Sequence, residues 1–162
     1  MPLVVNVRLA APAPPCVPFA LKRAIAAGPV IVSIDSSAGI RQTADALLPP
    51  RRTEQTDIVL CWDLINYLNQ PALTAVMECI ALRCKRGALA HGLVYYSAKS
   101  MPQRPSTFIP VDDHHIIQHL NPGIERPAPR YSPEDLARCM PRYSVERGRL
   151  LRNGMQEFLF KL

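Results

Sequence analysis

Apolar residues along the chain fall into short runs and longer periodic stretches, which indicate different elements. Four short runs rich in β-branched residues predict strands, because a strand buried on both faces needs apolar side chains at nearly every position. The runs lie at residues 4–9, 30–34, 57–62 and 88–96. The second run reads VIVSI and ends directly before Asp35.

Stretches with apolar residues three and four positions apart predict helices. Such stretches lie at residues 19–27, 38–48, 64–68 (a single turn), 70–85 and 133–140. Asn69 and Ser132 are the expected N-caps of the last two, because their side-chain oxygens can accept amide hydrogens of the first turn. Gly87 is expected to end the helix at 70–85, with Arg83, Lys85 and Arg86 at its negative end.

The end of the chain predicts a β-hairpin. Strand character is found at residues 143–151 and again at residues 155–162. The connection between them is Arg152, Asn153 and Gly154, and an Asn-Gly pair favours tight hairpin turns. The apolar MQEFLF segment is expected in the sheet core, or alternatively at an edge used for self-association. Many of the 17 prolines break up residues 100–131, which predicts loops there.

The alternation of strands and helices predicts the fold class. With 162 residues, the chain is long enough for one domain, expected to span 1–162. Strand-helix alternation favours a three-layer α/β/α Rossmann-like sandwich with a mostly parallel sheet, to which the C-terminal hairpin adds antiparallel strands. Ligands in such sheets bind beyond the carboxyl ends of the strands.

Composition and charge narrow the function classes. The net charge of +6 is spread thinly, and no cluster of Lys and Arg reaches the 5–8 residues typical of a nucleic-acid patch. No specific nucleic-acid partner and no membrane partner is therefore expected, and no apolar run approaches the ~20 residues of a membrane span. A soluble, cytoplasmic protein is predicted. Five cysteines without a Cys-x-x-Cys pair argue against a disulfide framework or structural zinc.

Polar and aromatic residues are densest directly after the strand at 57–62. Trp62, Asp63, Asn66 and Tyr67 could orient a small substrate, and the aromatic rings could face a cation. Alternatively, Asp63 caps the following turn while the aromatic residues pack in the core. His91, in the strand at 88–96, is either a hydrogen-bonded core histidine or a catalytic base.

The segment DDHHIIQH at 112–119 raises the question of a metal site. His115 and His119 would share one face of a helix, and His114 lies beside them. The segment lacks the glutamate of a hydrolytic zinc helix, and neighbouring prolines limit a helix there. A solvated loop or the rim of a pocket is the favoured interpretation, so no metal ligand is assigned.

Three segments resemble the class I S-adenosylmethionine-dependent methyltransferases. They are VIVSID at 30–35, DIVLCWDLINYL at 57–68, similar to that family's fourth strand and following loop, and KRGAL at 85–89, similar to the entry to its fifth strand. The closing hairpin also matches. Two departures stand beside these matches: the loop at 9–15 has no glycine, and only residues 49–56 separate the second predicted helix from the next strand, so the family's third strand is missing.

The resemblance implies a site and two hypotheses of function. S-adenosylmethionine would be the cofactor, with Asp35 binding the ribose hydroxyls. The implied cofactor-binding residues are Ala10, Asp35, Ser36, Ser37, Cys61 and Trp62. The residues implied to face the substrate are Asp63, Asn66, Tyr67 and His91. The first hypothesis is methyl transfer to a small molecule or a protein. The second is a noncatalytic methyltransferase-like module that binds a protein partner or its own copy as a homodimer.

Overall fold

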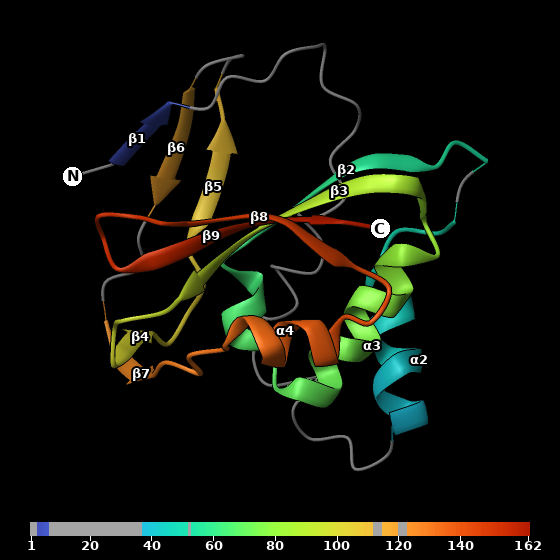
Figure 1. The fold of residues 1–162 in the computed structure, drawn as a ribbon, viewed down its shortest axis with the longest axis horizontal. Coiled ribbons are helices and arrows are strands. Elements are labelled where there is room, and N and C mark those ends of the chain that lie inside the picture. Colours follow the sequence, from blue (N-terminus) through green and yellow to red (C-terminus); the bar gives the residue numbers. More distant parts are fainter. Residues whose placement is uncertain (1–2, 7–36, 52, 112–114, 120–122) are drawn as a thin grey trace.

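The computed structural model describes residues 3–6, 37–51, 53–111, 115–119 and 123–162. Its helices are α2 (Ser37–Leu47), the single 3-10 turn η1 (Leu64–Tyr67), α3 (Gln70–Ala81) and α4 (Pro133–Cys139). Its strands are β1 (Leu3–Asn6), β2 (Thr56–Trp62), β3 (Cys84–Tyr95), β4 (Ser100–Pro102), β5 (Thr107–Pro110), β6 (His115–His119), β7 (Glu125–Pro127), β8 (Ser144–Leu150) and β9 (Met155–Lys161). Figure 1 shows the helices gathered below the largest sheet.

The largest sheet has four strands in the order β2-β3-β9-β8. β2 and β3 run parallel, whereas β9 pairs antiparallel with both β3 and β8. The α/β class is therefore confirmed, and the predicted hairpin does extend the sheet beside β3. The sheet is mixed, however, and the expectation of a mostly parallel sheet is not met in the described residues, because the hairpin supplies two of the three pairings. The strand predicted at 30–34 lies outside those residues.

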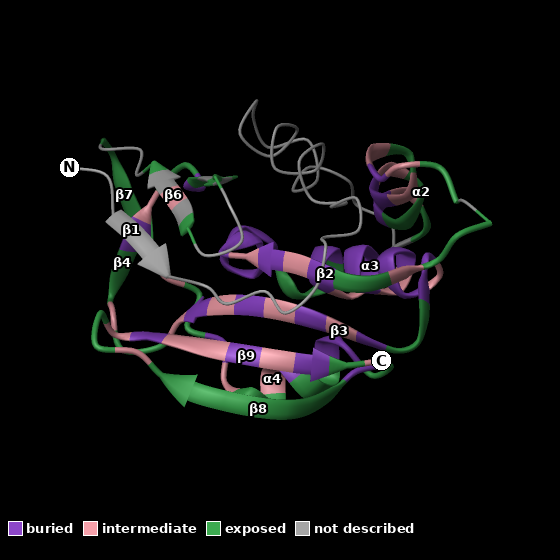
Figure 2. Ribbon diagram, turned by 90° about the horizontal axis from the view of Figure 1, so that it is seen from above, coloured by how far each residue is buried: buried purple, intermediate pink, exposed green. Residues whose placement is uncertain are grey.

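One hydrophobic core joins the helices to a single face of this sheet. β3 and β9 contribute alternate side chains to it, including Ala90, Val94, Phe158 and Phe160. Figure 2 shows the resulting alternation of buried and half-buried residues along β3 and β9, while β8 is exposed throughout. The two phenylalanine rings stack with their centroids 5.5 Å apart. The described helices form one layer on this face. The further helix predicted at 19–27, on which a third layer would depend, lies outside the described residues.

β1 does not join the main sheet, although the strand-helix alternation predicted one sheet that includes it. The β-branched run at 4–9 does form a strand over Leu3–Asn6, but this strand pairs antiparallel with β6, as in Val4 opposite Ile117. It belongs to a separate sheet in the order β1-β6-β5 and not to the four-stranded sheet. The prediction was wrong on this point because β-propensity favours an extended backbone without specifying which edge completes its hydrogen bonds. Figure 1 shows this small sheet beside the main one.

α3 ends at Ala81, earlier than the predicted end near residue 85. The guanidinium of Arg83 is buried; its Nε donates to Pro49 O at 2.7 Å and its Nη1 to Asp45 Oδ1 at 2.8 Å. This contact turns the chain into β3, which already contains Lys85 and Gly87. Neither the two basic residues 85 and 86 nor Gly87 therefore terminates the helix, and the tertiary contact of Arg83 explains why.

Other local predictions are confirmed. The Asn69 side chain accepts the Ala72 N–H at 3.0 Å, and Ser132 and Asp135 form a capping box at the start of α4. α2, β2, η1 and both hairpin strands lie where the sequence predicted them. No helix in the described part of the chain is long and apolar enough to cross a membrane.

Residues 100–131 contain more regular structure than predicted. β4 pairs with β7, and β5 pairs with β6, so the described parts of this segment form short antiparallel ladders. Prolines sit in three of these strands and limit their length, since proline cannot donate to a ladder. The segment between β4 and β5 lies against η1, which brings it to the carboxyl end of β2.

Candidate functional site at the carboxyl end of β2

β2 ends in a strained backbone. Trp62, its last residue, has φ 47°, in the left-handed region that large side chains rarely adopt. The register between β2 and β3 also shifts between Leu60 and Trp62. Strain of this kind costs of order 1–3 kcal/mol and concentrates at functional sites. The half-buried indole is therefore the first feature that marks this end of the sheet.

Asp63, the next residue, is only 2% exposed. Its Oδ2 accepts the backbone N–H of Ser106 at 2.9 Å. A buried carboxylate needs hydrogen-bond donors, because desolvation without them is costly. Asp63 thus holds the segment between β4 and β5 over the end of β2.

Asn66 is completely buried and bonds to the backbone through both ends of its amide. Its Nδ2 donates to Leu93 O at 2.7 Å and to Asp63 O at 3.0 Å, and its Oδ1 accepts the Tyr95 N–H at 2.9 Å. These bonds fasten η1 to the carboxyl end of β3. The hydrogen-bonding capacity of the side chain is directed at the protein's own main chain.

Tyr67 completes the cluster. Its hydroxyl lies 3.0 Å from Pro102 O and 3.1 Å from Arg104 O, so its single proton is donated within this pair of carbonyls. Burial, followed by the charge of Asp63, raises the pKa of this phenol well above its usual range. The Arg126 guanidinium lies 6.0 Å from the ring centroid, at the outer limit of a cation–π contact.

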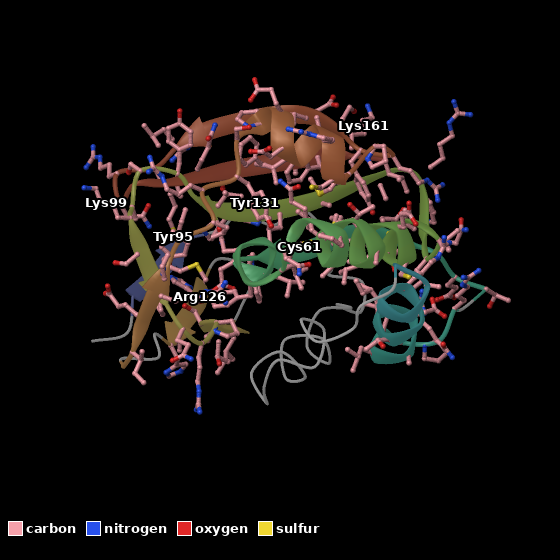
Figure 3. All side chains as sticks on the ribbon, turned by 90° about the horizontal axis from the view of Figure 1, so that it is seen from below. Cys61, Tyr95, Lys99, Arg126, Tyr131 and Lys161 are labelled. Atoms are coloured by element: carbon pink, nitrogen blue, oxygen red, sulfur yellow. The ribbon has the colours of Figure 1, made fainter. Side chains whose placement is uncertain are left out.

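Two further phenols surround this end of the sheet. The Tyr131 hydroxyl donates to Leu68 O at 2.6 Å, and burial raises the pKa of Tyr131 to about 12. Burial and then the charge of Asp63 raise the pKa of Tyr95. Figure 3 shows Tyr95 and Arg126 on the same side of the molecule as β4 and β7. All three phenols are therefore neutral at physiological pH, and those of Tyr67 and Tyr131 donate to backbone carbonyls.

The structure brings some of the sequence-predicted site residues together and separates others. Asp63, Asn66 and Tyr67 form one buried cluster with Trp62 beside it. His91 lies on the opposite face of the sheet, because its neighbours Ala90 and Gly92 point towards the helices.

The predicted cofactor residues are only partly described. Ala10, Asp35 and Ser36 lie outside the described residues, and Ser37 begins α2 with its side chain likewise undescribed. Trp62 is half-buried at the end of β2, and its implied contact with the cofactor stays a prediction. Cys61 is 2% exposed and belongs to the core, in the middle of the molecule in Figure 3, and its implied contact with the cofactor stays a prediction.

The histidines of the DDHHIIQH segment lie in a strand. His115 and His119 are exposed residues of β6, so the structure shows neither the favoured loop nor the alternative in which they share a helix face. The β5 and β1 strands on either side supply ladder partners that favour the extended form. His114 is outside the described residues, and within the described ranges no three His, Cys, Asp or Glu side chains gather as metal ligands would.

Sequence reasoning missed the partners of the cluster and the partner of His91. Ser106, Tyr95 and Glu157 come from segments 29 or more residues away from the groups they bond. No local spacing reports such contacts. The only available signal was that a buried Asp and Asn after a strand must find donors and acceptors somewhere in the fold.

Comparisons with known proteins give structural neighbours only. No family model and no curated protein matches the sequence. Among solved structures, the glycopeptide N-methyltransferase MtfA complexed with S-adenosyl-L-homocysteine matches at TM-score 0.45 and 9% identity, over 70% of this chain and 57% of that one. An S-adenosylmethionine-dependent methyltransferase from Clostridium acetobutylicum matches at TM-score 0.44 and 13% identity, over 70% of this chain and 61% of its own. The chain thus spans less than two thirds of the length of these neighbours, and similarities of this size leave activity, cofactor and substrate as proposals.

Proposed function

We propose that the chain is an S-adenosylmethionine-dependent methyltransferase-like protein that transfers a methyl group to a small molecule or a protein. The observation that carries the proposal is the strained Trp62 at the carboxyl end of β2. It stands where the resemblance to the family's fourth strand implies contact with cofactor or substrate. The parallel pairing of β2 with β3 and the antiparallel hairpin beside β3 support it, because the resemblance implies that arrangement.

In this proposal, Asp35 accepts hydrogen bonds from the ribose hydroxyls, with Ser36 and Ser37 beside the adenine. Trp62 faces the sulfonium. The cofactor when bound supplies an already activated methyl group, so the chain contributes mainly proximity and orientation. Three-layer packing and a larger parallel sheet belong to the same proposal, since they need the strand predicted at 30–34.

The buried cluster has a supporting part in this scheme. Asp63, Asn66 and Tyr67 hold η1 and the segment 102–106 in place, and that segment limits the access of water to the end of β2. A methyl acceptor would then contact the strand end through backbone groups and Trp62. Because Asp63 is 2% exposed, its carboxylate becomes available to a substrate only if the segment around Ser106 moves away from it.

Isothermal titration with S-adenosylmethionine and S-adenosylhomocysteine tests the proposal. Wild-type protein is expected to bind both, and Asp35→Ala is expected to abolish binding because the ribose loses its acceptor. Asp57→Ala is a matched control, since Asp57 is an exposed carboxylate paired with Lys85 at 2.9 Å, at the opposite end of β2. Absence of binding heat with the wild-type protein would contradict the proposal. Equal loss of binding in Asp35→Ala and Asp57→Ala would contradict the specific role of Asp35.

A second candidate is the noncatalytic module that binds a protein partner or its own copy. The engagement of Asp63 and Tyr67 by the chain's own backbone favours it, as does the glycine-free, proline-rich sequence at 9–15. Proline supplies no amide donor and fixes φ, which hinders the close approach of backbone to a cofactor. If the isothermal titration with S-adenosylmethionine gives no binding heat, and circular dichroism shows that the protein is folded, the result would favour this candidate over the enzyme.

A further inference from the structure

A histidine and a glutamate form a pair on the sheet face that points away from the described helices. His91 Nε2 on β3 lies 3.1 Å from Glu157 Oε1 on β9. The side chains are 23% and 35% exposed, so the pair is largely withdrawn from water. It plays no part in the cluster around Asp63.

The pair fixes which imidazole nitrogen carries the proton. An ionised carboxylate can only accept, so the hydrogen of the neutral ring resides on Nε2 and is donated to Glu157. His91 Nδ1 then presents a lone pair. This atom is shielded from solvent, and it has no hydrogen-bond partner within the described part of the chain. A buried acceptor without a donor is uncommon and calls for an explanation.

The surroundings of the ring are apolar along the sheet. Leu60 on β2 and Leu159 on β9 are the register partners of His91 on its two sides. Gly92, the next residue, is opposite Trp62, so His91 is level with the carboxyl end of β2. Two arginines of β8 share this face: Arg147 is level with His91 across Leu159, and Arg149 is opposite Glu157. His91 is therefore one residue along β3 from the position opposite Trp62, which marks the strand end proposed above as the site.

We propose that His91 Nδ1 accepts the proton of the methyl acceptor and that Glu157 is its positioning residue, which implies an acceptor with an N–H or O–H nucleophile. The inference rests on the proposed function. The nucleophile's lone pair forms the bond to the methyl carbon, and the carbon–sulfur bond breaks with its electron pair going to sulfur. The N–H or O–H proton passes to Nδ1. The products are the methylated acceptor, S-adenosylhomocysteine and an imidazolium held by Glu157.

Two substitutions of His91 separate this role from a structural one. In His91→Gln, the side-chain amide can reproduce the Nε2 donor to Glu157 but offers no basic nitrogen. In His91→Asn, a polar atom replaces Nδ1 and the bond to Glu157 is lost. If the pair only supports the sheet, His91→Gln should behave as wild type and His91→Asn should be the damaged variant. If Nδ1 takes the proton, His91→Gln should fold normally and lower kcat by about 10²–10⁴-fold.

The tautomer provides a readout that needs no activity. Long-range proton–nitrogen NMR of the labelled full chain should show the proton on Nε2 at neutral pH. In Glu157→Met, the ring of His91 should become a mixture of the two neutral tautomers. In Glu146→Met, a substitution on the exposed strand β8, the proton should stay on Nε2 as in wild type. A wild-type ring protonated on Nδ1 would overturn the inference, whatever the protein binds.

Methyl transfer completes the test. The probes are S-adenosylmethionine with a panel of a primary amine, a phenol, an alcohol and a carboxylic acid, assayed by release of S-adenosylhomocysteine. Transfer to the amine, phenol or alcohol that falls in His91→Gln supports the inference, and undiminished transfer in that variant overturns it. Failure of S-adenosylmethionine to bind would overturn the proposed function and the proton transfer together, while leaving the tautomer held by Glu157 as a separate finding.

Discussion

The side-chain oxygen of Asn66 accepts the backbone N–H of Tyr95 at 2.9 Å, which joins the 3-10 turn after β2 to the last residue of β3. The same amide donates to Leu93 O, so one side chain closes the end of the parallel strand pair. Because parallel strands are joined through long connections, this link between their carboxyl ends is a tertiary contact that neither strand provides alone.

Replacing Asn66 with Leu should therefore be strongly destabilising. The substitution keeps the volume but leaves the Leu93 carbonyl and the Tyr95 N–H without their partner, whereas Asp63 O still accepts the backbone N–H of residue 66. Unsatisfied buried groups cost about 1–3 kcal/mol each, so we expect a loss of at least about 2 kcal/mol in the free energy of unfolding in urea. Asn69→Ala removes only the cap of α3 and should cost about 1 kcal/mol. Equal losses in the two variants would contradict the account of Asn66.

The contact between Asp45 and Arg83 should make stability depend on acid pH. The hydrogen bond from Arg83 holds the pKa of Asp45 below its usual value, so the native state binds the proton less tightly than the unfolded chain. The contribution is complete above the unfolded pKa of about 3.9 and disappears as pH falls through the lower native value. Its size is modest, since the Asp45 side chain is 46% exposed.

Asp45→Asn tests this pH dependence directly. Wild type should be more stable than the variant at pH 6, and the difference should shrink as pH is lowered towards 2. Thermal unfolding at a series of pH values gives the comparison. If the stability difference between wild type and Asp45→Asn stays constant over this pH range, the charge of the Asp45 carboxylate does not contribute to stability.

Two glycines in the left-handed region should differ in their tolerance of a side chain. Gly87 (φ +82°) has open space where a Cβ would lie, whereas at Gly154 (φ +78°) that atom would come within 2.5 Å of Ser97 Oγ. Gly87→Ala should cost about 1–2 kcal/mol from backbone strain alone. Gly154→Ala should cost more, because it also displaces Ser97 from its bond to Gly154 O. Denaturant midpoints compare the two variants, and a smaller loss at Gly154 would count against this view of the turn.

The outer strand β8 has two arginines that should disfavour its pairing with β8 of a second copy of the chain. Arg147 and Arg149 are opposite Leu159 and Glu157 of β9 and so share one face of the sheet. In a two-fold antiparallel pairing, residues of the same face meet, which sets arginine against arginine. Arg147→Thr with Arg149→Thr should therefore increase self-association, as measured by light scattering across a concentration series. If the wild-type protein is a homodimer and the double substitution makes it monomeric, the arginines promote self-association and the prediction is contradicted.

Local signals were sufficient for much of the fold. The caps at Asn69 and Ser132 and the turn at Gly154 act within a few residues, so the sequence alone located the elements they bound. β1 could not be assigned to its sheet in the same way, since its partner β6 is more than 100 residues away. The end of α3 was misplaced for a similar reason, because Arg83 is drawn to Asp45 on another helix.

The candidate site was predicted in composition but not in connectivity. A polar and aromatic group after β2 was expected, and Asp63, Asn66 and Tyr67 do lie together there. Their bonds to Ser106, Tyr95 and the backbone at 102–104 depend on how residues 100–131 fold back. The pair of His91 with Glu157 likewise joins strands that are adjacent only in the finished sheet.

Trp62 offers the most direct measurement of the central claim, because it is the only tryptophan in the chain and stands at the proposed site. Its fluorescence should change saturably as S-adenosylmethionine or S-adenosylhomocysteine is added, and the change should be absent in Asp35→Ala. Adenosine alone should compete, since the ribose contact is the same. Fluorescence that stays constant up to millimolar cofactor, in a protein shown to be folded, would contradict the placement of a cofactor site at the carboxyl end of β2.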